Sequence, residues 1–209
     1  MLIVISNPTD LDNESDILNT LFSKGLQTLH LRKTGGKRED YEKLLKDISP
    51  ENKKKVVLHQ YHELATKYNI KGLHLKEDHR KKLNLQELKS LKREMKNKNL
   101  TFSTSFHSIE DIDCHDGLFD YVFLSPVFES ISKPGHVSET LFKIDSKKNE
   151  TKIIALGGVQ SNNIEKVKEL GFDGIAVLGA VWQNTQPAEA QFLEIQNQYS
   201  KHFTNSLIH

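Results

Sequence analysis

Short apolar runs rich in Val, Ile and Leu alternate with segments of helical periodicity along this chain of 209 residues. The apolar runs lie at residues 2–6, 28–32, 55–59, 72–76, 101–105, 121–125, 152–156 and 174–178. The helical patterns lie at residues 14–25, 38–48, 63–69, 84–98, 108–116, 162–171 and 187–203. Because strands that alternate with helices form parallel sheets, the sequence predicts an α/β fold. Eight strands at about 26 residues per repeat favour a closed (β/α)8 TIM barrel of parallel strands, with an open doubly wound sheet as the alternative.

The spacing of these repeats gives no domain boundary and no linker. We therefore expect residues 1–209 to form a single domain. After the sixth apolar run the alternation is interrupted by a longer connection that reaches Glu150, in which only residues 138–144 have a short helical pattern.

The composition is that of an ordinary soluble globular protein, with 36% hydrophobic and 27% charged residues. Its 29 basic residues nearly balance its 28 acidic ones, and the basic clusters are not interleaved with aromatic residues, so nucleic acid is not expected as a partner. No apolar run approaches the roughly 20 residues that a membrane span needs, which predicts no membrane association and a cytoplasmic location. The single cysteine, Cys114, cannot form an internal disulfide and is interpreted as a structural or incidental thiol and not a reactive one.

Polar residues gather at the carboxyl ends of the predicted strands. They are His30, Arg32, Lys33, His59, Gln60, Lys76, Glu77, Asp78, Ser103, Ser105, His107 and Ser125. In a parallel barrel these ends converge on one mouth, where the active sites of such folds lie. Ser108 and Asn162 differ from them, since each precedes a helical pattern with an acidic residue in its first turn, and we interpret both as helix caps.

Two neighbouring strand ends contain glycines that indicate a phosphate site. Gly157 and Gly158 end the seventh predicted strand, and Gly179 follows the eighth. Backbone N–H groups at adjacent strand ends can surround a phosphate dianion closely when no side chain intervenes. A tight turn also explains a Gly-Gly pair, but the pairing with Gly179 favours a phosphorylated small molecule as the ligand.

Several segments occur together in the order and spacing of a known family. They are LHLRK (29–33), GLHLKED (72–78), STSFHS (103–108), DYVFLSPVFESISKPG (120–135) and IIALGGVQSNNIEKVKELGFDGIAVLGAV (153–181). The chain resembles the thiamine phosphate synthase superfamily, which also contains thiazole tautomerases. The resemblance implies a (β/α)8 barrel transferase of thiamine biosynthesis. Such an enzyme joins hydroxymethylpyrimidine diphosphate to thiazole phosphate and releases pyrophosphate with the help of Mg²⁺.

The resemblance also implies roles for individual positions. Arg32 and Lys133 match family residues that bind the pyrophosphate, and Ser105 matches a serine that contacts the pyrimidine; these three are the predicted catalytic residues. A guanidinium suits the first task because its fork of charged donors fits phosphate oxygens. Asp78 matches a Mg²⁺-binding aspartate, an oxygen ligand appropriate to that ion. The predicted substrate-binding residues are His30, Ser130, Ser132, His107, Gly157, Gly158, Leu178 and Gly179.

The chain departs from the family pattern at several of these ends. His59, Gln60 and Tyr61 stand where synthases have an Asn-Asp-Asp run that holds Mg²⁺, so one carboxylate is missing and metal affinity should be lower. His30 replaces a family glutamine, which makes LHLRK more similar to the tautomerases. Ser125 replaces the acid/base histidine of the tautomerases, in a Ser-Pro pair that resembles the Gly-Pro of the synthases.

Three functions fit this combination of features. The chain is predicted to be a thiamine phosphate synthase, with two alternatives: a thiazole-phosphate tautomerase, or a non-catalytic regulator that binds thiazole phosphate or thiamine phosphate. A tautomerase needs a proton carrier, for which His107 and His136 are the strongest candidates among the histidines, and Glu129 is a further candidate acid. The sequence leaves open the choice among the three functions, the binding of Mg²⁺ and the formation of a homo-oligomer.

Overall fold

The structure, a computed structural model, describes residues 1–128, 142–145, 148–183 and 187–204. Within them eight parallel strands pair in chain order, and the last pairs with the first to close a barrel. The strands are β1 (Leu2–Ile5), β2 (Leu29–Leu31), β3 (Val56–Leu58), β4 (Gly72–Leu75), β5 (Thr101–Phe106), β6 (Tyr121–Leu124), β7 (Lys152–Leu156) and β8 (Gly174–Val177). The predicted (β/α)8 TIM barrel is confirmed, and the open doubly wound sheet is excluded. That residues 1–209 form a single domain stays a prediction.

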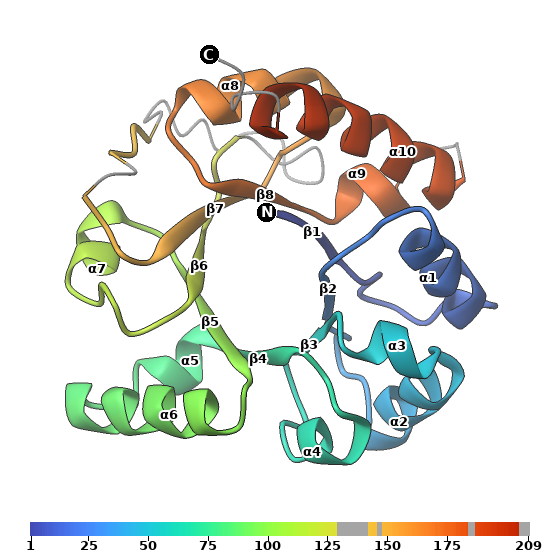
Figure 1. Cartoon of the computed structure of the whole chain (residues 1–209), viewed down its shortest axis with the longest axis horizontal. Helices are drawn as coiled ribbons and strands as arrows, with labels where there is room; N and C mark the ends of the chain where they lie inside the picture. Colours follow the sequence, from blue (N-terminus) through green and yellow to red (C-terminus); the bar gives the residue numbers. More distant parts are fainter. Residues whose placement is uncertain (129–141, 146–147, 184–186, 205–209) are drawn as a thin grey trace.

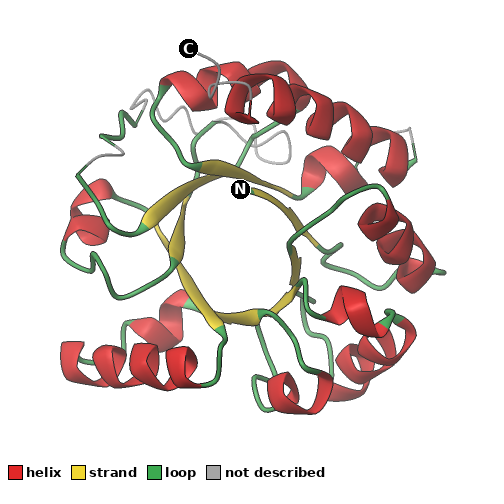
Figure 2. Cartoon of the chain, viewed as in Figure 1, coloured by secondary structure: helices red, strands yellow, loops and turns green. Residues whose placement is uncertain are grey.

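Helices surround the ring of strands on its outside, as Figures 1 and 2 show. In the described residues they are α1 (Glu14–Ser23), α2 (Arg38–Asp47), α3 (Pro50–Lys53), α4 (Leu64–Tyr68), α5 (Glu77–Arg80), α6 (Leu85–Asn97), α7 (Ile109–Asp113), α8 (Ile164–Glu169), α9 (Gly179–Trp182) and α10 (Ala188–Tyr199), with the 3₁₀ helix η1 (Ser161–Asn163) and the π-helix η2 (Ser200–Thr204). Each segment with a predicted helical pattern outside 138–144 contains one of these helices. The short helices α3, α5 and α9 have no predicted counterpart, because four residues carry no distinctive periodicity.

The short helical pattern predicted at residues 138–144 has no helix in its described part. Residues 142–145 are not helical, and the rest of the short pattern at 138–144 lies outside the described residues. Among the described helices, none is long and apolar enough to cross a membrane.

The two predicted helix caps have different outcomes. Ser108 Oγ accepts a hydrogen bond from the Asp111 backbone N–H at 3.1 Å, which confirms it as the N-cap of α7. The assignment of Asn162 is wrong, because the helical turn begins earlier and Asn162 lies inside η1. The capping contact there is made by Asn163, whose Oδ1 accepts from the Gln160 backbone N–H at 2.9 Å.

The interior of the barrel is apolar on one side and polar on the other. Side chains alternate along each strand, so that the leucines of β2 and β4 pack outward against helices while the residue between them points inward. An apolar cluster from β1, β6, β7 and β8 fills one side with Ile3, Ile5, Tyr121, Phe123, Ile154 and Ala176. The inward residues of β2 and β4 are histidines, whose rings contact Phe123 at centroid distances of 4.8 and 5.1 Å.

Candidate active site at the mouth of the barrel

The polar strand ends converge on a cavity of about 450 Å³ at the mouth of the barrel. It is lined by Ile5, Arg32, Lys33, Thr34, Gly35, His59, Gln60, His74, Lys76, Glu77, Asp78, Ser105, His107, Phe123, Ser125 and Leu156. The predicted convergence is therefore observed for Arg32, Asp78, Ser105 and His107. His30 is fully buried and does not line this cavity.

Three imidazole rings pack together at the base of the mouth. His59 and His74 are stacked with ring centroids 4.1 Å apart, and the ring of His30 meets both at a steep angle. Nδ1 of His30 lies 2.9 Å from Nε2 of His59, and Nε2 of His30 lies 2.6 Å from the Tyr121 hydroxyl. Both ring nitrogens of His74 contact serine hydroxyls of β5, at 3.0 and 3.1 Å. Because one partner in each pair must supply the proton, these contacts couple the tautomers of neighbouring rings.

Burial keeps these imidazoles neutral. Desolvation lowers the pKa of His30 and His59 well below the ordinary value, and it lowers the pKa of His74 to about 3. One ring nitrogen from each residue lies within 4.8 Å of the others. The nearly parallel rings of His59 and His74 direct their lone pairs side by side instead of toward one point, and Mg²⁺ prefers oxygen ligands. The cluster is therefore a hydrogen-bonded floor to the cavity that does not fit Mg²⁺.

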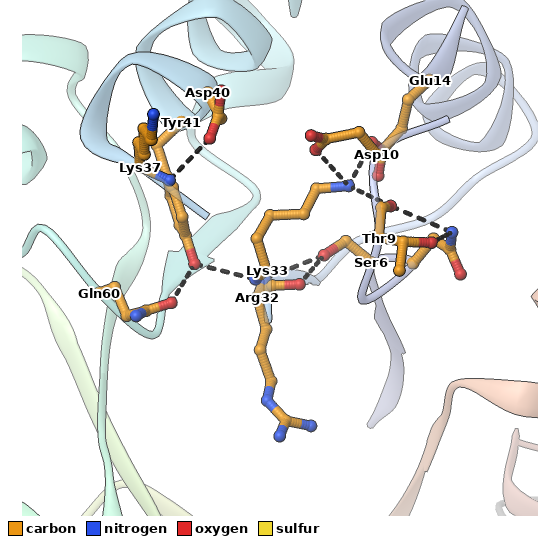
Figure 3. A network of polar contacts seen from close by, with 11 residues as sticks. Ser6, Thr9, Asp10, Glu14, Arg32, Lys33, Lys37, Asp40, Tyr41 and Gln60 are labelled. Atoms are coloured by element: carbon orange, nitrogen blue, oxygen red, sulfur yellow. Dashed lines mark hydrogen bonds and ion pairs between the residues drawn. The ribbon is translucent and has the colours of Figure 1, made fainter. Parts of the chain in front are cut away.

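Arg32 and Lys33 leave the end of β2 in opposite directions (Figure 3). Ser6 Oγ accepts from the Arg32 backbone N–H and donates to the Arg32 carbonyl oxygen, each at 2.9 Å, which fixes this strand end. The Lys33 side chain is 1% exposed, forms an ion pair with Glu14 and donates to the Thr9 carbonyl oxygen at 2.9 Å. The interpretation of Lys33 as a polar group of the mouth is therefore wrong for its ammonium, because a buried carboxylate holds it elsewhere.

Gln60, which follows β3, is engaged in hydrogen bonds. Its side-chain amide lies 2.7 Å from the Tyr41 hydroxyl, which also accepts from the Lys33 backbone N–H at 2.9 Å (Figure 3). The amide orientation that complements every neighbour donates from nitrogen to Tyr41 and to the Lys33 carbonyl oxygen at 3.0 Å. In that orientation the amide oxygen accepts from Lys76 Nζ at 2.9 Å. The ends of β3 and β4 are thus joined by an ammonium–amide hydrogen bond.

Helix α5 brings two carboxylates to the mouth. Asp78 lies in its first turn and is exposed. Glu77 forms an ion pair with Lys81 at 2.7 Å and a hydrogen-bond contact with His107 Nε2 at 3.1 Å, and the hydrogen bond from Lys81 lowers the pKa of Glu77. The other ring nitrogen of His107 contacts the Ser125 carbonyl oxygen. Within the described part of the mouth, Asp78 is therefore the carboxylate better placed to meet a metal ion.

A smaller cavity of about 140 Å³ lies at the ends of β7 and β8. It is lined by Leu156, Gly157, Gly158, Val159, Gln160, Ala176, Val177, Leu178, Gly179, Ala180 and Gln183. Gly157 and Gly158 have φ angles of 94° and 67°, a region that side chains rarely adopt. A Cβ on Gly157 would also lie 2.9 Å from Pro126 Cα. The residues predicted to surround a phosphate do form the wall of one cavity, and the backbone requires glycine there.

Five of the residues singled out in the sequence lie outside the described residues. They are Glu129, Ser130, Ser132, Lys133 and His136. Their roles stay predictions.

The sequence gives no role at this site to His74, Tyr41 or Glu14. His74 has a readable signal, because a histidine between two leucines on a strand points to the opposite face from both. Tyr41 and Glu14 come from α2 and α1 and reach the site by packing across elements, which leaves no local pattern.

The chain is similar to known proteins over most of its length. Residues 2–181 match a family model described as thiamine monophosphate synthase. The thiamine-phosphate synthase of Clostridium tetani is 26% identical over 172 residues, which cover 79% of this chain and 78% of the relative. That of Bacteroides fragilis strain YCH46 is 27% identical over 177 residues, which cover 79% of this chain and 83% of the relative. The crystal structure of thiamine phosphate pyrophosphorylase from Bacteroides thetaiotaomicron superposes with a TM-score of 0.74 at 27% identity, covering 95% of this chain and 97% of that chain.

Proposed function

Since the chain belongs to the thiamine monophosphate synthase family, we propose that it is a transferase that joins hydroxymethylpyrimidine diphosphate to thiazole phosphate. The products are thiamine phosphate and pyrophosphate. Its partners are then small phosphorylated molecules and not nucleic acid or a membrane, and the cytoplasm is the proposed location.

The observation that best supports this reaction is that the two cavities share a wall. Leu156 lines both the mouth and the smaller glycine-walled cavity. Thiazole phosphate with its phosphate in the smaller cavity would extend its ring toward the mouth, where Arg32 and Ser105 lie. Two phosphorylated molecules can therefore lie side by side, as a transfer between them requires.

The proposed chemistry uses the residues of the mouth. The thiazole nitrogen forms a bond to the methylene carbon of the pyrimidine while the bond from that carbon to the diphosphate oxygen breaks, and the electron pair leaves with the diphosphate. Cationic groups beside this oxygen stabilise the charge that develops on it. We assign this task to Arg32 and, from outside the described residues, to Lys133, with Ser130 and Ser132 as further contacts to the leaving group. Ser105 would contact the pyrimidine, held by its 3.1 Å contact to the His74 ring.

The family resemblance also implies Mg²⁺, which neutralises diphosphate charge when bound. The described residues do not fit a site in which the protein holds this ion. Glu77 is paired with Arg80, Lys81 and His107, and the Gln60 oxygen faces the Lys76 ammonium, which leaves Asp78. A Mg²⁺ ion that reaches the mouth would be held mainly by the diphosphate itself.

The geometry favours the synthase over the two alternatives. A tautomerase needs a side chain that can take and return a proton. Among the described residues the candidate is His107, whose ring nitrogens are both hydrogen-bonded, whereas His136 and Glu129 lie outside the described residues. A regulator would need one ligand site, whereas two adjoining cavities are present among the described residues.

The test is to incubate purified protein with both proposed substrates, with and without Mg²⁺, and to assay thiamine phosphate and pyrophosphate. We expect both products, and Arg32→Ala should lower turnover by about 10²-fold or more while leaving thiazole-phosphate affinity nearly unchanged. Arg38→Ala is the control, since Arg38 pairs with Glu42 on the surface of α2. Isomerisation of thiazole phosphate without pyrophosphate release would identify a tautomerase, and binding without turnover would identify a regulator.

A further inference from the structure

Lys76 places a cation at the mouth that the proposed synthase assignment leaves without a role. It lines the cavity together with Arg32 and Asp78, and its side chain is exposed there. In the amide orientation that complements its neighbours, the Gln60 oxygen accepts from the Lys76 ammonium at 2.9 Å and positions it. The amide nitrogen of Gln60 is in turn held by Tyr41 and the Lys33 carbonyl oxygen, so the acceptor that positions Lys76 is itself fixed.

This arrangement conflicts with a metal ion at the end of β3. A carboxylate at position 60 would attract a divalent cation, but the amide is neutral and its oxygen already accepts from an ammonium. A divalent cation at the same oxygen would lie within a few ångströms of the Lys76 charge, where repulsion between like charges is strong. Ammonium and metal therefore exclude one another at Gln60.

We propose that Lys76, positioned by Gln60, binds the diphosphate leaving group together with Arg32 and takes the place of a magnesium ion held by the protein. This inference rests on the proposed synthase reaction. Lys76 would donate hydrogen bonds to diphosphate oxygens, and these bonds strengthen as the carbon–oxygen bond breaks and its electron pair moves onto the diphosphate. No additional reactant is needed, since the ammonium stays protonated throughout.

Within the described residues, the neighbouring lysines Lys33 and Lys81 do not offer the same group. The Lys33 ammonium is buried against Glu14 and faces away from the mouth. Lys81 is exposed at the C-terminal end of α5, pairs with Glu77 and does not line the cavity. Lys81→Ala therefore removes the same charge from the same helical segment without removing a group of the mouth, which makes it the matched control.

The test measures binding of inorganic pyrophosphate by calorimetry in the presence of EDTA. We expect wild type to bind pyrophosphate without metal, Lys76→Ala to weaken this binding by about tenfold or more, and Lys76→Arg to retain most of it because the charge is kept. Lys81→Ala should bind as wild type does. Thermal unfolding of each variant shows whether the fold is intact, and Lys76 is exposed, so its replacement should not disturb the core.

A second readout uses magnesium titration of the synthase reaction. Wild type should be active at metal concentrations that leave Gln60→Asp/Lys76→Ala inactive, and added Mg²⁺ should restore the double variant, whose new carboxylate can bind the ion. Pyrophosphate binding that requires Mg²⁺ in wild type, or that Lys76→Ala leaves unchanged, would overturn the inference. Metal-free binding through Lys76 without any thiamine phosphate formation would refute the proposed function instead, so the two failures are distinguishable.

Discussion

At the scale of single residues, two adjacent cationic residues at the end of β2 have different roles because their side chains point in different directions. Arg32 and Lys33 are adjacent and both cationic, yet the first faces the cavity and the second is buried in an ion pair with Glu14 (Figure 3). The buried pair fixes the backbone from which Arg32 projects. Glu14 is 3% exposed, and burial raises its pKa while the hydrogen bond from Lys33 opposes that rise.

Breaking the buried pair should cost more than removing it completely. Glu14→Ala leaves the buried Lys33 ammonium with only the exposed carboxylate of Asp10, at 3.7 Å, and we expect a loss of up to about 3 kcal/mol in the free energy of unfolding. Glu14→Leu combined with Lys33→Met removes both charges and should recover most of that loss. Urea unfolding of the three proteins measures the difference. A double variant less stable than Glu14→Ala would contradict the expectation.

Gly158 tests the proposed phosphate cavity at the same scale. Gly158→Asp places a carboxylate beside the dianion and should weaken thiazole-phosphate binding by well over about tenfold, because like charges repel strongly where water is scarce. The φ angle of 67° also strains any side chain, so Gly158→Asn is the control: asparagine has the same shape, tolerates this backbone region and carries no charge. Calorimetry with thiazole phosphate separates the two effects. Equal affinity of the two variants for thiazole phosphate would show that this cavity does not bind the phosphate.

At the scale of elements, three histidines connect β2, β3 and β4 on the inside of the barrel, on the opposite face from the leucines of these strands. His30 of β2, His59 at the end of β3 and His74 of β4 form one cluster of rings on the polar side of the barrel, in which His59 and His74 are stacked and His30 meets both edge-on. Aliphatic side chains would fill this space equally well, but they would not hold the Ser105 hydroxyl or the tautomers of neighbouring rings. These rings can pack this closely only while all three imidazoles are uncharged.

Acid should therefore weaken the barrel through these strands. Because the folded-state pKa of His74 is about 3 and the unfolded value is near 6.5, the unfolded chain binds more protons below pH 6.5, and stability falls from there toward pH 3. One such group contributes a slope of up to about 1.4 kcal/mol per pH unit. We expect His74→Gln to lose about 2 kcal/mol less than wild type between pH 7 and pH 5, measured by urea unfolding at both values. Identical pH dependence in the two proteins would show that folding does not lower the pKa of His74.

At the scale of the whole molecule, the sequence predicts what depends on local pattern and misses what depends on packing between elements. All eight strands follow from apolar runs, and the glycine-walled cavity follows from Gly157, Gly158 and Gly179 because strand ends of a parallel barrel must meet. The direction of Lys33 and the partner of Gln60 do not follow, since each is decided by a side chain from a distant element. The role of Lys76 is visible only once the ends of β3 and β4 are placed side by side.

Because the barrel is closed, a steric clash between two strands should lower the free energy of unfolding of the whole fold. Gly72 begins β4 beside β5, and a Cβ at this position would lie 2.0 Å from Thr101 Oγ1 and 2.4 Å from the Thr101 carbonyl oxygen. A strand of an open sheet could shift to relieve this contact, whereas in a closed ring the shift must be shared by neighbouring strands. We expect Gly72→Ala to lose about 2 kcal/mol or more, which lowers the melting temperature by roughly 4–8 °C for a chain of this size.

The comparison for this prediction is Gly179→Ala, in which the added Cβ comes close to the flexible end of Gln183, at 2.9 Å, instead of to backbone. Its melting temperature should fall less than that of Gly72→Ala, because a side-chain amide can rotate away while the Thr101 carbonyl is fixed in the sheet. Circular dichroism and Trp182 fluorescence should report the same midpoint in each variant, since strand pairing and the β8 end unfold together in a closed barrel. A midpoint for Gly72→Ala within about 1 °C of wild type would mean that β4 and β5 separate without cost. In that case the close contact between Gly72 of β4 and Thr101 of β5 would not contribute to the stability of the closed barrel.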